Sequence, residues 1–190
     1  MPNVQTDFFN EVRERMDVFL SKIRDDIKAE LVAQNHVLTG TLLNSIDFEI
    51  QQKPNLIEGL MMMQDYGQAI DQGIKASNVP YSANTGRGGT SKYIQGLITF
   101  FRLKGLDEDE AKSAAFATAR TATIEGHPTN GSFVHSTNGR RTGFFTDTLE
   151  NLNGEIDAFY EEMGENVVLT VWNNILTRFT NEVEPIILRA

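Results

Sequence analysis

The residues with the clearest potential for chemistry lie in a glycine-rich segment, GRGGTSK, at positions 86–92. A glycine-rich loop that leads into a helix can cradle phosphate with its backbone N–H groups. The phosphate-binding loop has the spacing G-x-x-x-x-G-K-[S/T], whereas here Lys92 follows serine and precedes tyrosine. We therefore interpret 77–92 as a polar loop that orders against a neighbouring subunit, with Arg87, Lys92 and Tyr93 as interface candidates. A nucleotide-dependent enzyme is the alternative.

Other catalytic patterns are missing from the sequence. The three histidines, His36, His127 and His135, share no metal-ligand spacing, and the chain has no cysteine. No serine lies in a G-x-S-x-G motif, and the carboxylates are spread along helical faces rather than paired. We expect no catalytic residue, no metal site and no cofactor, and therefore a protein that is not an enzyme.

A second polar segment covers residues 129–143 and ends with the basic pair Arg140-Arg141. The aromatic pair Phe144-Phe145 follows it directly. Long polar segments inside a domain usually have a function, and loops that reach a neighbour are one such use. We expect these four residues to contact a partner subunit.

The overall charge narrows the class of partner. The chain has 190 residues, with 17 Lys and Arg against 26 Asp and Glu, which gives a net charge of −9. Nucleic-acid affinity comes mainly from basic side chains that neutralise phosphates, so this balance argues against a broad nucleic-acid-binding face. No apolar run approaches the roughly 20 residues of a membrane helix, and the N-terminus lacks the features of a signal peptide. We expect one soluble intracellular domain over residues 1–190, with no membrane partner.

Periodicity predicts the elements that position these segments. Apolar residues at three- and four-residue steps predict a long amphipathic helix over 7–35, and alternation predicts a β-hairpin over 44–64. The triplet Met61-Met62-Met63 on the returning strand is interpreted as core filler rather than as an adaptable binding surface. Further helices are predicted over 92–104, 107–125 and 144–180, with a short strand near 167–171 as an alternative within the last. The helix predicted over 107–125 begins at an Asp107–Glu110 capping box.

These elements give an α+β fold. A long N-terminal amphipathic helix and further helices pack on a small antiparallel sheet, and two long polar loops connect them. Hydrophobic stripes of this kind bury one face of each helix against the sheet.

Four segments also follow one another in a characteristic order. They are LTGTLLNSI at 38–46, YGQAIDQG at 66–73, Gly105 with AKSAAFATARTATIEG at 111–126, and TGFF at 142–145. Together they resemble the motifs T-G-x-L-x-x-S-I, Y-A-x-x-V-E-x-G, K-G…A-x-x-I-A-R-x-I-x-x-x-G and R-P-F-F of the tail-completion and neck (head–tail connector) proteins of tailed bacteriophages. Aspartate replaces the usual glutamate in the second motif, and Thr-Gly replaces Arg-Pro in the fourth. The residues that carry the resemblance are Gly40, Tyr66, Asp71, Gly73 and Gly126.

The resemblance implies a structural subunit of the virion neck. Such a subunit forms a homo-oligomeric ring, commonly six- or twelve-fold, that joins the portal or adaptor of the head to the tail-terminator or tail-tube proteins. DNA passes through the ring only as cargo, and assembly takes place in the host bacterial cytoplasm. A tail terminator or another tail-ring protein is an alternative within this class. A small helical adaptor or regulatory binding protein is the alternative from another class. For Tyr66, Asp71 and Gly73, local packing and a helix stop are favoured over direct contact with a partner.

Overall fold

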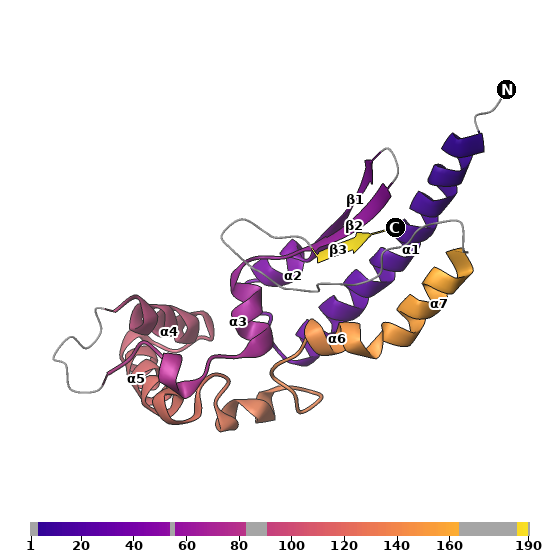
Figure 1. Cartoon of the computed structure of the whole chain (residues 1–190). Helices are drawn as coiled ribbons and strands as arrows, with labels where there is room; N and C mark the ends of the chain where they lie inside the picture. The colour runs from indigo at the N-terminus through magenta and orange to yellow at the C-terminus, as the bar shows by residue number, and fades with distance from the viewer. Residues whose placement is uncertain (1–3, 54–55, 83–90, 164–185, 190) are drawn as a thin grey trace.

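The long N-terminal helix organises the structure. In the computed structural model, which describes residues 4–53, 56–82, 91–163 and 186–189, helix α1 (Val4–Ala33) lies between a small sheet and two C-terminal helices (Figure 1). The apolar stripe expected from the sequence is buried along its length: Val12, Met16, Leu20, Ile23, Ile27 and Leu31. The amphipathic helix expected over 7–35 is confirmed, because this stripe faces the core while the charged positions between lie outside.

The sheet has three antiparallel strands in the order β1-β2-β3. Strands β1 (Asp47–Lys53) and β2 (Leu56–Met62) form the hairpin expected over 44–64, and the short helix α2 (Thr41–Ser45) precedes it. Strand β3 (Ile186–Arg189), which the sequence analysis did not anticipate, pairs with the other edge of β2. Helix α1 crosses β2 at Gly59, where an added Cβ would lie 2.7 Å from a methyl carbon of Leu20.

The C-terminal helices differ from the single helix expected over 144–180. Helix α6 (Thr146–Asn151) and helix α7 (Asn153–Met163) are separated at Leu152, whose N–H is shared between the carbonyls of Thr148 and Leu149 in a tightened turn. The remainder of the expected helix and the alternative strand at 167–171 lie in residues 164–185, outside the described part of the chain. Helix α7 packs along α1, and the rings of Phe19 and Phe159 stack with centroids 4.5 Å apart.

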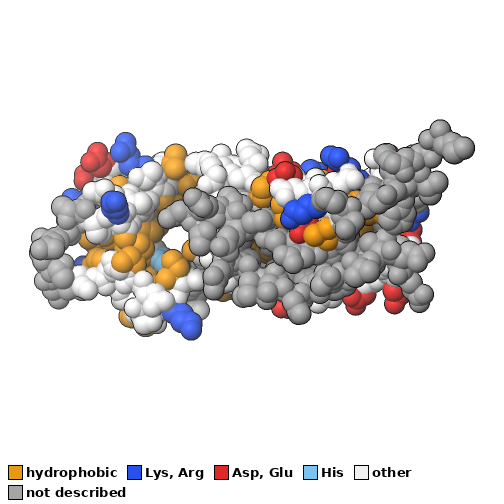
Figure 2. Space-filling view, turned by 45° about the horizontal axis from the view of Figure 1, so that its top comes forward, with side chains coloured by type: hydrophobic (Ala, Val, Ile, Leu, Met, Phe, Trp, Pro, Cys, Tyr) orange, Lys and Arg blue, Asp and Glu red, His pale blue; other side chains and the backbone are white. Residues whose placement is uncertain are grey.

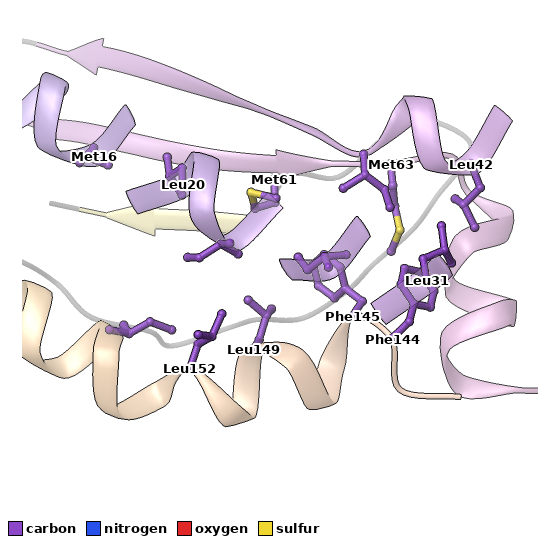
Figure 3. Packing of buried hydrophobic residues seen from close by; sticks show 14 of the residues in the cluster. Met16, Leu20, Leu31, Leu42, Met61, Met63, Phe144, Phe145, Leu149 and Leu152 are labelled. Carbon is purple, nitrogen blue, oxygen red and sulfur yellow. The ribbon is translucent and has the colours of Figure 1, made fainter. Parts of the chain in front are cut away.

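The main hydrophobic core is shared by α1, the sheet and α6–α7. Figure 3 shows side chains from these elements interlocking in one cluster. Met61 and Met63 are buried in it, which confirms for these two that they fill the core between the sheet and the long helix, whereas Met62 is half-buried and lies outside the cluster. We call α1, α2, α3 (Tyr66–Gln72), the sheet, α6 and α7 the body.

A second lobe, residues 74–127, extends from the body and is called the arm (Figure 1). Helix α3 (Tyr66–Gln72) leads into it, followed by the 3-10 turn η1 (Ala76–Asn78), helix α4 (Lys92–Leu103) and helix α5 (Glu108–Glu125). The expected capping box is confirmed: Asp107 accepts from the N–H of Glu110, and the Glu110 carboxylate accepts from the N–H of Asp107. Helix α5 turns a stripe of small buried side chains inward: Ala111, Ala115, Ala119 and Ala122.

The arm and the body have separate interiors. Among the described residues of the arm, 74–82 and 91–127, none that is buried belongs to the main core cluster. No helix in the described ranges is both long and apolar enough to span a membrane.

Candidate functional site

The arm joins the body where the chain enters and leaves it at a single point. Ile74 and His127 pair as an antiparallel bridge, with N···O distances of 2.7 and 2.8 Å in the two directions. Gly73 and Gly126 come immediately before these two residues, one on each strand. We call these four residues the glycine crossing. The two glycines were expected from separate sequence motifs, and the structure brings them together.

Both glycines of the crossing have backbones that other residues avoid. Gly73 has φ 73° and ψ −178°, and Gly126 has φ 86° and ψ −166°. This region is essentially limited to glycine. An added Cβ on Gly73 would lie 2.5 Å from the carbonyl oxygen of His127, and one on Gly126 would lie 2.4 Å from that of Ile74. The two strands can therefore approach this closely only without side chains at these positions.

Asp71 fastens the end of α3 to the segment that leads into α6. Its side chain is 4% exposed, and its Oδ1 accepts hydrogen bonds from the backbone N–H groups of Phe145, at 2.7 Å, and Thr146, at 3.3 Å. The carbonyl of Asp71 also accepts from the N–H of Gly143 at 2.8 Å. Burial raises the pKa of the Asp71 carboxyl, and these backbone donors oppose that rise. Asp71 therefore joins two of the motif segments, a role beyond the helix stop expected for it.

Other motif residues lie nearby with simpler roles. Gly40, with φ 77°, precedes α2 in the left-handed conformation. Tyr66 is 46% exposed, so it does not pack into the core as expected, whereas Ile70 packs against the core cluster.

Phe144 and Phe145 are core residues, and the expectation that they contact a partner is wrong. They are 0% and 2% exposed and belong to the main hydrophobic cluster (Figure 3). The bonds to Asp71 fix the backbone at this point, and the two rings then fill the space beside α1. A fully buried side chain has no surface to offer a neighbour.

The basic pair is also engaged within the chain. The guanidinium of Arg141 donates from Nη1 to the carbonyls of Gln34, at 2.6 Å, and Asn35, at 3.3 Å, just beyond the C-terminal end of α1. Arg140 forms an ion pair with Asp147. The polar segment 129–143 includes the 3-10 turn η2 (Asn130–His135) and docks on α1, instead of extending freely toward a neighbour as expected.

The three candidates of the first polar loop have different positions. Arg87 lies outside the described residues, in 83–90. Lys92 is exposed at the start of α4. The hydroxyl of Tyr93 is hydrogen-bonded to Nε2 of His127 at 2.6 Å, so Tyr93 supports the glycine crossing from inside its own chain.

A pocket of about 390 Å³ lies where α4 approaches the body. Its walls come from the segment 35–43, from α3, from the end of α4 and from Arg141. His36 forms part of this wall, and its Nε2 donates to the carbonyl of Arg141 at 3.1 Å. Burial, and then the nearby Arg141 charge, lower the pKa of His36 from 6.5 to about 4. The sequence analysis missed this pocket because its residues come from four distant segments.

The lowered pKa of His36 predicts a loss of stability on acidification. The unfolded chain binds a proton at His36 near pH 6.5, whereas the folded chain resists it down to about pH 4, so the free energy of unfolding falls as the pH drops through this window. We expect urea unfolding to show a larger loss between pH 7 and pH 5 for the wild type than for His36→Gln. His135→Gln, at an exposed histidine, should behave as the wild type. Equal losses in the wild type and in His36→Gln would contradict the assignment.

Within the described ranges, no three His, Cys, Asp or Glu side chains lie close enough together to hold a metal ion. Comparison with family models, curated proteins and solved structures gave no match. The glycine crossing, Asp71 and the pocket are therefore interpreted from their own geometry.

Proposed function

We propose that this chain is a structural subunit of the neck of a tailed bacteriophage. Copies assemble, in the cytoplasm of the host bacterium, into a six- or twelve-fold ring that connects the head to the tail and lets DNA pass. In this role the protein acts through its shape and its contacts rather than through catalysis.

The arrangement of the motif segments supports the proposal. The segments 66–73 and 142–145 meet through the bonds of Asp71 to Phe145 and of Gly143 to Asp71. The segments 66–73 and 111–126 meet at the glycine crossing. Three of the four segments that resemble one family in their order along the chain are thus also in direct contact.

The observation that carries the proposal is the apolar surface of the arm. Phe100 and Leu103, one turn apart at the end of α4, are 38% and 56% exposed. Figure 2 shows hydrophobic side chains gathered at the surface of this lobe. Exposed groups of large apolar side chains are typical of surfaces that bind another protein. An arm that extends from one copy and packs on the next forms a head-to-tail contact, and such contacts close into rings.

We expect Leu103→Asp to block the joining of heads to tails. A charge in the middle of the apolar contact must be desolvated on assembly, which is costly. In phage that carry this variant, electron microscopy should show filled heads and free tails. A contact weakened by roughly 1.4 kcal/mol forms about tenfold less often, so the infectious titre should fall by at least about tenfold. Thr121→Asp adds the same charge at an exposed polar position of α5, away from Leu103, and should leave the titre unchanged.

Labelling of wild-type particles tests the location. Gold-labelled antibodies against the chain should mark the junction of head and tail. Label on the capsid shell, label along the tail, or no label on the particle would each contradict the proposal. A normal titre for Leu103→Asp would contradict the role of the arm.

A further inference from the structure

We infer that the pocket between α4 and the body binds a carboxylate side chain of a partner protein, presented beside an apolar residue. The inference rests on the pocket itself and holds whether or not the chain forms a ring. It adds a binding site of defined chemistry where residues of the motif segments 38–46 and 66–73 meet the end of α4 and Arg141.

The charge of the pocket is the first reason. Its wall holds the cationic side chains of Arg141 and Lys104, and none of the residues that line it is acidic. The chain as a whole has an excess of nine acidic residues. A wall that gathers two cations and excludes carboxylates in such a chain is complementary to an anion.

Arg141 is held in place at the wall of the pocket. Its Nη1 donates to the carbonyls of Gln34 and Asn35, while its Nε is buried and has no hydrogen-bond partner among the described residues. A buried donor without a partner is uncommon, and burial lowers the pKa of this guanidinium. Arg141 is held in a fixed position by its bonds to Gln34 and Asn35 and by the bond that its backbone carbonyl accepts from His36. A fixed guanidinium can bind an incoming carboxylate with little loss of side-chain entropy.

The apolar part of the wall explains the second element of the ligand. Tyr66 and Phe100 are half-exposed in the pocket, and Ile70 lies between α3 and the core. The ammonium group of Lys104 lies 5.7 Å from the centroid of the Phe100 ring, so a cation and an aromatic surface are presented together. A free anion such as phosphate would use only the charges, whereas a glutamate next to a leucine uses both.

The size and position of the pocket favour a segment of protein. A volume of about 390 Å³ lies within the usual range for ligand sites and accommodates two side chains. Leu103, whose side chain is exposed, precedes the lining residue Lys104 and lies one turn after the lining residue Phe100 on α4. A chain that places its carboxylate in the pocket can therefore continue over the apolar surface of the arm.

A peptide titration tests the inference. The probe is acetyl-Leu-Glu-Leu-amide, added to the full-length ¹⁵N-labelled chain, with acetyl-Leu-Gln-Leu-amide as its uncharged match. We expect the Glu peptide to shift the backbone signals of 36–43, 66–70 and 100–104, and the Gln peptide to bind at least about tenfold more weakly.

Variants locate the charge that is responsible. Lys104→Glu should weaken binding of the Glu peptide by about tenfold or more while the other signals stay in place, because Lys104 is exposed. Lys112→Glu makes the same change on the exposed face of α5, away from the pocket, and should bind as the wild type. Equal binding of the two peptides, shifts in another region, or an unaffected Lys104→Glu would each overturn the inference. Equal affinity for inorganic phosphate, or displacement of the peptide by a short DNA duplex, would assign the pocket to another class of ligand and overturn it as well.

Discussion

Replacement of Gly73 or Gly126 by alanine is expected to lower the free energy of unfolding by about 3–5 kcal/mol. Two costs add at each position. The backbone lies at positive φ with extended ψ, where an L-residue is strained. The new Cβ would also lie within 2.5 Å of a carbonyl oxygen on the opposite strand, so the bridge between Ile74 and His127 must open.

The measurement is equilibrium urea unfolding of the full chain, combined with hydrogen exchange at the amides of Ile74 and His127. Gly96→Ala is the matched control, because Gly96 lies in α4 with no atom within 4 Å of an added Cβ. Alanine there should raise the free energy of unfolding by up to about 1 kcal/mol. If Gly73→Ala cost no more than a few tenths of a kcal/mol, or if both amides stayed protected, the crossing would not require glycine.

Phe144→Ala should destabilise the body by about 3–5 kcal/mol, the usual cost of removing a buried aromatic ring from a packed core. The ring is fully buried among the residues of the main cluster, so its loss leaves a cavity that the rigid α1 cannot fill. Phe133→Ala removes the same atoms from a residue that is 36% exposed on η2 and should cost about 1 kcal/mol or less.

The same experiment separates a core role from an interface role. An interface phenylalanine changes association and leaves the stability of the isolated chain nearly intact. A core phenylalanine changes stability first. Urea unfolding at a concentration where the chain is monomeric therefore decides between the two roles. An unaltered urea midpoint of unfolding for Phe144→Ala would restore the expectation that this residue contacts a partner.

The local features of the fold were accessible from the sequence. The stripe of α1 repeats every three to four residues, and the alternation of β1 has a period of two, so each is recorded within a short window of the chain. The capping box of α5 was predicted because both of its bonds join residues three positions apart. Met61 and Met63 were interpreted correctly because their strand faces the apolar stripe of α1.

The features that define the candidate site depend on residues far apart in the sequence. Asp71 meets Phe145 across 74 positions, and Arg141 reaches Gln34 across 107. No periodicity signals such contacts, so Phe144 and Phe145, next to a polar segment, were taken for surface residues. Gly73 was interpreted as a helix stop, and Gly126 was noted only as a residue of another motif. Their shared role appears only when the two strands are placed side by side.

The glycine crossing also makes the arm a module. The chain returns to the body beside the point where it left. The pairing of β1 with β2 and the position of α6 therefore do not depend on the length of the chain between Ile74 and His127. In the part of the arm that the structure describes, no buried residue belongs to the body's main core cluster. Helices can thus be lengthened, shortened or exchanged beyond this point while the body keeps its packing. Changes in the sequence of the arm can in this way be accepted without rebuilding the fold that carries it.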